Sequence, residues 1–191
     1  MSTLVVALRI ASLLVFAGPM LLAGARHGGR SGSRAPRSGS ELAPLAAHLA
    51  AVGMYVPSLL VFSGSATGST ALLLAWSGLL LAVAGVALVV RSRAELGPAW
   101  SFAPRADRGT GLVTTGPYRL VRHPIYLGLA LLATGQALAF ASWPALVIVL
   151  FGIVPTFAWR ARTEEAMLSR AFGDRYAEYR QRSRMIIPYL L

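Results

Sequence analysis

The sequence contains no cysteine and no lysine, and it has few charged residues for its length. The absence of cysteine excludes a disulfide, a thiolate nucleophile and a cysteine-ligated metal site. Only 13% of its 191 residues are charged, whereas about 25% is usual in soluble proteins. Hydrophobic residues make up 55% of the chain, and the mean hydropathy is +0.61. A soluble domain of this size cannot bury so much apolar surface, so the composition indicates an integral membrane protein.

Five apolar stretches are long enough to cross a bilayer as helices. Crossing about 30 Å of hydrocarbon takes about 20 helical residues, with about 17 as the lower limit. The stretches are 2–25, 42–62, 70–90, 125–141 and 144–160, the last two separated by Ser142-Trp143-Pro144. Backbone groups in lipid must be hydrogen-bonded internally, and these runs do not alternate as barrel strands do. The expected fold is therefore all-α, a membrane bundle of about five transmembrane helices.

The arginines predict the orientation of this bundle. Seventeen of the 18 lie in 26–41, 91–123 and 160–191, and none lies in the connections at 63–69 and near 142. Basic loops face the cytoplasm, so the N-terminus is expected outside and the C-terminus inside. This asymmetry accounts for the net charge of +11 without nucleic acid as a partner. The arginine-only, alanine-rich composition is typical of a bacterial protein, which favours the cytoplasmic membrane.

The first three spans offer little chemistry. Ala23-Gly24-Ala25 could end a signal peptide, but a retained helix keeps the basic Gly/Ser/Arg loop at 26–41 on the cytoplasmic side. Arg9 is expected to reach the membrane interface. For His48, a hydrogen bond between packed helices is the favoured role. Small residues of the third span favour close helix contact; they are Gly78, Ala82 and Gly85.

Polar side chains gather in the second half of the chain, first over residues 96–128. Pro124 suits the first turn of a helix, where its missing N–H costs nothing. This places His123 at the start of the fourth span, where open N–H groups favour an anion. Arg119 and Arg122 add positive charge beside it.

A second polar segment, 160–188, follows the fifth span. Arg160 and Glu164 are four residues apart and share a helix face. Several apolar side chains share another face, which predicts an amphipathic helix along the interface; they are Leu168, Ala171, Phe172, Tyr176 and Tyr179. A short hairpin of the last two spans would bring Arg160 and Glu164 close to His123 and Tyr126.

Common cofactor and hydrolase motifs are absent from the sequence. There is no Gly-x-Gly-x-x-Gly, no P-loop, no His-Glu-x-x-His and no Gly-x-Ser-x-Gly. Any nucleotide-type cofactor is therefore expected in a non-Rossmann pocket, and no metal site is expected.

The two polar segments resemble the isoprenylcysteine carboxyl methyltransferase family and its wider relatives, which include phospholipid N-methyltransferases. The resemblance covers about residues 96–190. It rests on Gly116-Pro117-Tyr118-Arg119, Arg122-His123-Pro124-x-Tyr126-x-Gly128, Arg160, Glu164-Glu165, Phe172-Gly173, Tyr176, Tyr179 and Ile187-Pro188. Ile125 departs from the small residue that often follows His-Pro in this family.

This resemblance implies S-adenosylmethionine (SAM) as cofactor, in a pocket capped by a cytoplasmic C-terminal amphipathic helix. The implied cofactor-binding residues are Leu112, Val113, Tyr118, His123, Pro124, Tyr126, Glu164 and Glu165, and the implied catalytic residues are Arg160, His123 and Arg122. Residues 1–90 would then form three N-terminal helices with the basic loop 26–41. Residues 91–191 would form the methyltransferase region, with a loop, the hairpin 124–160 and the interfacial helix.

The implied reaction transfers a methyl group to the carboxylate of a lipophilic or prenylated acceptor that enters from the membrane. A carboxylate is already an anion, so alignment and exclusion of water would suffice. Three alternatives stay open. An amine or thiol acceptor, as in phospholipid methylation, would need a base such as His123 or Glu165. An NADPH-dependent sterol-type reductase shares a similar C-terminal half, and a non-catalytic scaffold could retain the fold.

Overall fold

The computed structural model describes residues 3–25, 39–64, 66–97 and 111–187, and these residues form helices without strands. The α-helices are α1 (Thr3–Ala25), α2 (Gly39–Val61), α3 (Gly68–Leu96), α4 (Pro124–Ala139), α5 (Trp143–Ile148), α6 (Val154–Phe172) and α7 (Asp174–Arg182). A 3-10 turn, η2 (Gly116–Arg119), precedes α4, and a π-helical turn, η3 (Val149–Ile153), joins α5 to α6. The predicted all-α class is confirmed. Most of the basic loop 26–41, the segment 98–110 and Pro188 lie outside the described residues.

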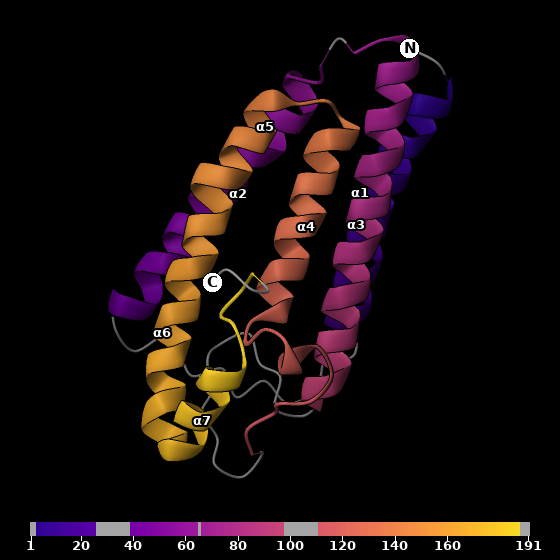
Figure 1. Cartoon of the computed structure of the whole chain (residues 1–191). Coiled ribbons are helices and arrows are strands. Elements are labelled where there is room, and N and C mark those ends of the chain that lie inside the picture. Colours follow the sequence, from indigo (N-terminus) through magenta and orange to yellow (C-terminus); the bar gives the residue numbers. More distant parts are fainter. Residues whose placement is uncertain (1–2, 26–38, 65, 98–110, 188–191) are drawn as a thin grey trace.

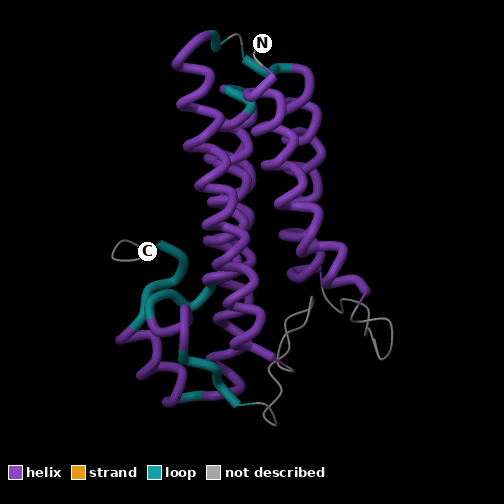
Figure 2. The backbone as a smooth tube through the Cα atoms, turned by 90° about the vertical axis from the view of Figure 1, so that its right-hand side faces the viewer, coloured by secondary structure: helices purple, strands orange, loops and turns teal. Residues whose placement is uncertain are grey.

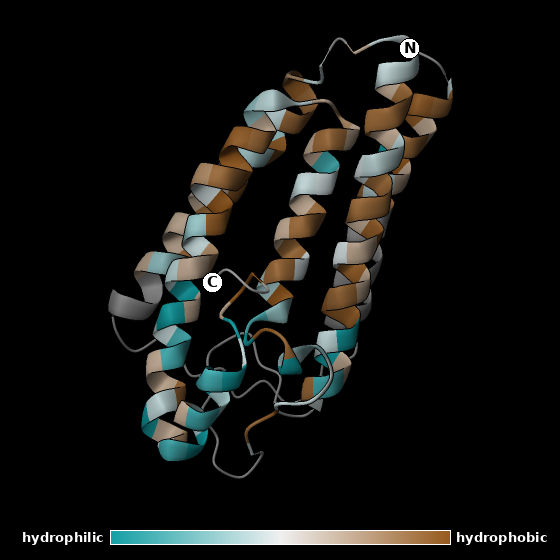
Figure 3. Cartoon of the chain, viewed as in Figure 1, coloured by the Kyte–Doolittle hydropathy of each residue, from teal (hydrophilic) through white to brown (hydrophobic). Residues whose placement is uncertain are grey.

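The long helices run side by side along one axis, and the short polar elements gather at one end (Figures 1 and 2). Three described helical runs are long and apolar enough to cross a membrane: Ala43–Val61, Gly68–Leu96 and Trp143–Phe172. The apolar stretches Thr3–Leu14 and Pro124–Ala139 are shorter. Hydrophobic residues cover most of the bundle, whereas hydrophilic residues dominate the end that carries α7 (Figure 3). This division is typical of a membrane protein with one polar end.

The turn between the last two apolar helices lies where the sequence predicts it. Residues 140–142 separate α4 from α5, and Pro144 occupies the first turn of α5. The Ser142 hydroxyl donates to the Ser58 carbonyl at 2.9 Å and accepts from the Ala145 N–H at 3.4 Å. This side chain therefore starts α5 and ties it to α2.

The expected helix boundary at residue 160 is wrong. The run that starts at Trp143 continues through Arg160 to Phe172 because no proline or glycine interrupts residues 156–172. Gly173 then adopts φ +54°, a conformation that glycine tolerates best, and α7 begins after it. The predicted interfacial helix over 160–188 is therefore two helices, the second half of α6 and the nine-residue α7.

Close packing of α3 against α4 fixes the position of the site. Gly78 and Gly85 of α3 face Gly135 and Gly128 of α4. A Cβ atom at Gly85 would lie 2.5 Å from the Gly128 carbonyl oxygen, so only glycine permits this approach. The expected close contact of the third span is confirmed, and its partner is α4.

Two polar side chains of the N-terminal helices have defined roles. His48 Nδ1 lies 3.2 Å from the Thr156 hydroxyl, which confirms the expected hydrogen bond between packed helices. Arg9 is 6% exposed, and its guanidinium donates to the carbonyls of Ala139 and Phe140 at 3.0 and 3.3 Å. It therefore satisfies the carbonyls that α4 leaves open at its C-terminal end.

The chain after α7 returns to the start of α4. The Arg122 N–H donates to the Arg184 carbonyl at 2.7 Å, and the His123 N–H donates to the Met185 carbonyl at 3.0 Å. Ile186, which follows, is buried in the main core. These contacts place the segment after α7 beside the N-terminal end of α4, as the chain path in Figure 1 shows.

Candidate active site

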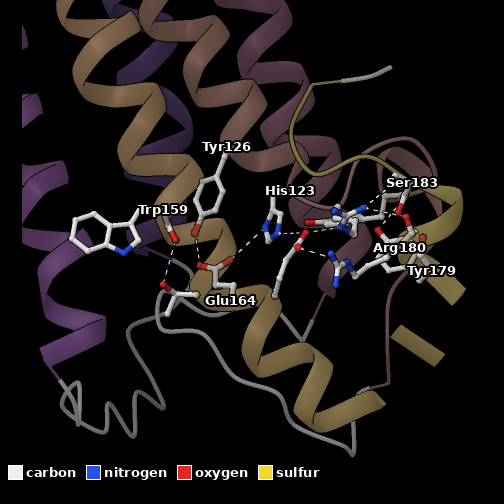
Figure 4. Close-up of polar contacts among 11 residues, drawn as sticks. His123, Tyr126, Trp159, Glu164, Tyr179, Arg180 and Ser183 are labelled. Carbon is white, nitrogen blue, oxygen red and sulfur yellow. Dashed lines mark hydrogen bonds and ion pairs between the residues drawn. The ribbon is translucent and has the colours of Figure 1, made fainter. Parts of the chain in front are cut away.

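His123 lies between two adjacent carboxylates at the polar end of the bundle. Its Nδ1 is 3.5 Å from Glu164 Oε2, and its Nε2 is 3.6 Å from Glu165 Oε1. Figure 4 shows the imidazole of His123 directed toward the Glu164 side chain of α6. The hairpin therefore brings His123 and Glu164 together, as the sequence predicts.

Tyr126 and Arg160 complete the surroundings of Glu164. The Tyr126 hydroxyl donates to Glu164 Oε1, and Arg160 Nε donates to the Tyr126 oxygen at 2.8 Å and to Glu164 Oε1 at 3.3 Å. Arg160 and Glu164 lie one helical turn apart on α6, and Tyr126 lies one turn inside α4. The four residues predicted to meet at the hairpin thus form one hydrogen-bonded group.

Glu165 has a separate cation, Arg122. Arg122 Nε donates to Glu165 Oε1 at 2.6 Å, and NH1 donates to the carbonyls of Ser183 and Arg180 at 2.5 and 3.4 Å. Arg180 itself lies 3.9 Å from Glu165. Arg122 therefore binds the open carbonyls at the end of α7, a role that its residue type and position in the sequence do not reveal.

His123 is buried, with 7% of its surface exposed. Burial lowers the pKa of His123, but the neighbouring carboxylates of Glu164 and Glu165 more than offset this and raise it above its ordinary value. The two carboxylates therefore favour the imidazolium form. Its Nε2 has no hydrogen-bond partner within the described residues and contacts Glu165 only as an ion pair. This leaves a buried donor available to a ligand.

Stacked rings continue from His123 into the bundle. The Tyr126 ring stacks on His123 with centroids 5.6 Å apart and on Phe157 at 5.1 Å, and His48 lies 4.8 Å from Phe157. Stacking fixes the Tyr126 ring, so its hydroxyl is held in place for Glu164. Phe157 is a member of this group that the sequence reasoning missed, because an aromatic residue in an apolar helix carries no separate signal.

The remaining predicted cofactor residues lie in a neighbouring apolar cluster. Three buried tyrosines form this cluster: Tyr118, Tyr176 and Tyr179. Leu112 and Val113 pack against them, as do Leu168 and Phe172 at the end of α6. The Tyr179 hydroxyl donates to the Tyr118 carbonyl at 2.7 Å, and burial raises the pKa of Tyr179 to about 12. Pro124 is fully buried at the first turn of α4. The predicted residues thus form two adjacent groups, one charged and one apolar.

Stability should depend on pH through His123. A histidine with a raised folded pKa contributes stability that is fully present below about pH 6.5 and is lost as pH rises through the folded pKa. We therefore expect the melting midpoint of the wild type to exceed that of His123→Gln most at pH 6, and the difference to shrink toward pH 9. Thermal unfolding in detergent measures it. His48→Gln is the control, because His48 faces a hydroxyl; a His123 difference that grows with pH would contradict this assignment.

Comparisons with known proteins identify a family and several relatives of this chain. The family model for phospholipid methyltransferases matches residues 73–175. A protein-S-isoprenylcysteine O-methyltransferase of Schizosaccharomyces pombe is 32% identical over 105 residues, covering 53% of this chain and 44% of that protein. The Saccharomyces cerevisiae protein of the same name is 38% identical over 79 residues, covering 41% and 33%. A cobalt-zinc-cadmium resistance protein, CzcN, of Cupriavidus metallidurans is 32% identical over 102 residues, covering 52% and 46%.

A solved structure shares the fold. The eukaryotic intramembrane Ras methyltransferase, an isoprenylcysteine carboxyl methyltransferase, superposes with a TM-score of 0.58 at 21% sequence identity, covering 76% of this chain and 52% of that one. The chain spans less than half the length of the curated relatives it matches. The family match covers more than half of the 191 residues and includes Arg122, His123, Arg160, Glu164 and Glu165. The chain therefore belongs to the phospholipid methyltransferase family.

Proposed function

We propose that the protein is an integral membrane methyltransferase that uses SAM and methylates the carboxylate of a lipophilic acceptor. This proposal rests on one observation. At the polar end of an apolar bundle, the carboxylates of Glu164 and Glu165 form ion pairs with His123, and Glu164 also pairs with Arg160. Family membership supports methyl transfer, and the relatives named protein-S-isoprenylcysteine O-methyltransferase support a carboxylate on a prenylated molecule as acceptor.

The residues of the site fit the chemistry of SAM. When bound, SAM supplies an electrophilic methyl group on a sulfonium, next to an amino acid group and ribose hydroxyls. Glu164 and Glu165 are suited to accept hydrogen bonds from the amino group and hydroxyls. The buried His123 Nε2, which has no hydrogen-bond partner in the described residues, is suited to donate to the cofactor's carboxylate. Leu112, Val113 and Tyr118 offer an apolar surface beside these groups.

Arg122 fits a positioning role better than the catalytic role expected of it. Its guanidinium is already hydrogen-bonded to Glu165 and to two carbonyls at the end of α7. Through these bonds it orients Glu165 and holds the C-terminal segment beside His123. We infer that α7 and the returning residues 183–187 cover the cofactor in this way.

Arg160 is suited to hold the acceptor. Its side chain is 24% exposed at the mouth of the hairpin, and its contacts with Tyr126 and Glu164 fix its direction. A guanidinium binds a carboxylate through two parallel hydrogen bonds. The acceptor oxygen would then attack the methyl carbon in line with the carbon–sulfur bond, and the sulfur would leave with the electron pair of that bond. No proton moves in this step, so the residues need only align the reactants and exclude water.

The protonated state of His123 favours a carboxylate over an amine acceptor. An amine must lose a proton to become a nucleophile or product. The neighbouring carboxylates raise the pKa of His123 and so favour its protonated form, and Glu165 is hydrogen-bonded to Arg122. Neither residue is therefore suited to act as the base that phospholipid amine methylation needs.

We also infer that α1 and α4 cross the membrane, which gives five spans. Arg9 in α1 is hydrogen-bonded to the end of α4, and α4 packs along α3, a helix long enough to span. The arginine-rich ends favour a cytoplasmic site with the N-terminus outside.

Single cysteines can test this orientation, because the natural chain contains none. Ser63, between α2 and α3, and Arg175, on α7, are both exposed. A membrane-impermeant maleimide should label Ser63→Cys in intact bacterial cells and label Arg175→Cys only after permeabilisation. Labelling with the opposite pattern would show that the site faces outward.

Glu164 should be required for SAM binding. Glu164→Gln removes a charged acceptor, and loss of a hydrogen bond to a charged group weakens affinity by about tenfold or more. Equilibrium binding of tritiated SAM to the purified protein in detergent measures this. Glu178→Gln is the matched control, because Glu178 is exposed on α7. Equal SAM affinity in Glu164→Gln and the wild type would refute the assignment.

Arg160 should be required for methylation of acids. Purified protein is incubated with labelled SAM and a panel of lipophilic carboxylic acids, thiols and amines, and methylated products are counted. We expect acids to be methylated, and Arg160→Gln to lower kcat/KM for them by about 100-fold with a much smaller change in SAM affinity. Arg162→Gln, at an exposed position two residues away, should behave like the wild type. Methylation of amines alone would refute the carboxylate assignment.

A further inference from the structure

An open depression of about 500 Å³ lies beside the candidate active site, on the outer face of α7. We call it the basic depression; its lining includes Arg122, Arg180, Gln181, Arg184 and Met185. Of the residues predicted for catalysis or SAM binding, only Arg122 lines it. The basic depression is therefore separate from the His123, Tyr126 and Glu164 group.

The basic depression carries an excess of positive charge. Three of its lining residues are arginines, and the neighbouring carboxylate is Glu165, which lies 2.6 Å from Arg122 and 3.9 Å from Arg180. The Arg180 side chain is 54% exposed. Arg184 is exposed and forms no ion pair with the residues that the structure describes. Three guanidinium groups against one buried carboxylate favour an anionic ligand.

The basic depression lies where the apolar bundle meets the polar end. Arg184 N–H donates to the Leu120 carbonyl at 3.0 Å, and Met185 accepts from the His123 N–H, so both residues lie at the start of α4. Met185 and Ile187 pack against the main core, and Ile186 is buried in it. The colours of Figure 3 change from hydrophobic to hydrophilic near this level. An apolar surface therefore continues from the charged lining into the bundle.

We propose that the basic depression binds the phosphate of an anionic phospholipid. Guanidinium groups bind phosphate oxygens through paired hydrogen bonds, and basic pockets beside membrane helices attract anionic headgroups. The amide of Gln181 is a further donor, and Met185 adds an apolar side chain to the lining. The lipid is a bound effector, not a methyl acceptor, because the phosphatidylglycerol headgroup has neither an amine nor a carboxylate. Its binding would fasten α7 and the returning segment to the start of α4.

Thermal unfolding of the full chain in detergent micelles tests this proposal. Dioleoyl phosphatidylglycerol is titrated against dioleoyl phosphatidylcholine, and the melting midpoint is measured. We expect a saturable rise with phosphatidylglycerol. The double variant R180Q/R184Q should require about tenfold more phosphatidylglycerol for half of the rise. R180K/R184K, which keeps the charges but loses the paired hydrogen bonds, should be intermediate.

The matched control is R162Q/R170Q, which removes two exposed arginines of α6 that do not line the basic depression. It should respond to phosphatidylglycerol as the wild type does. Equal weakening of both double glutamine variants would show general charge attraction and overturn the proposal. The proposal would also be overturned if phosphatidylglycerol did not raise the melting midpoint of the wild type. An equal rise with soluble glycerol phosphate would overturn it too, because it would show that the lipid is not required.

Discussion

Two adjacent carboxylates in a largely buried site impose the main constraint on this protein. Removing a charge from water costs several kcal/mol unless a partner compensates it, and Glu164 and Glu165 occupy consecutive positions on α6. Consecutive helical side chains point in different directions, so each carboxylate needs its own cation. Arg160 serves Glu164, Arg122 serves Glu165, and His123 lies between them. Neutralising the pair therefore requires α4, α6 and the end of α7 to meet at one place.

The helix that delivers His123 is held at both ends by distant parts of the chain. Arg9, 130 residues away in sequence, donates to the Ala139 carbonyl at the C-terminal end of α4. At the other end, the Met185 carbonyl accepts from the His123 N–H. Between these ends, the glycines of α3 and α4 let the backbones approach closely. A short helix with fixed ends and a tight side contact cannot slide, which preserves the contact between His123 and both glutamates.

The sequence predicted those features that depend on local residue type. Pro124 marked the start of α4, Ser142-Trp143-Pro144 marked the turn, and the spacing of Arg160 and Glu164 placed both on one face. The predicted end of the fifth span at residue 160 was wrong, because it was placed where the sequence changes from apolar to polar. The helix α6 continues past this change and ends only before Gly173. The contacts of Arg122 could not be predicted either, because two of its partners are backbone carbonyls, which every residue possesses. The proximity of Glu164 to His123 could be predicted, but the contact of Glu165 with His123 and the division of cations between the two glutamates could not.

The electrostatics of the site favour a reaction that removes charge. Transfer from a sulfonium to a carboxylate converts one positive and one negative group into two neutral ones, whereas transfer to a neutral amine leaves a positive product. In a water-poor site, interactions between charges are stronger than in water. The oppositely charged reactants attract each other as they meet, and Arg160 can hold the anion without accepting a proton. In the proposed reaction, the cations that neutralise Glu164 and Glu165 would keep their partners, so the protein would not need to rearrange its charges. A carboxylate acceptor therefore fits the surroundings of His123 better than an amine.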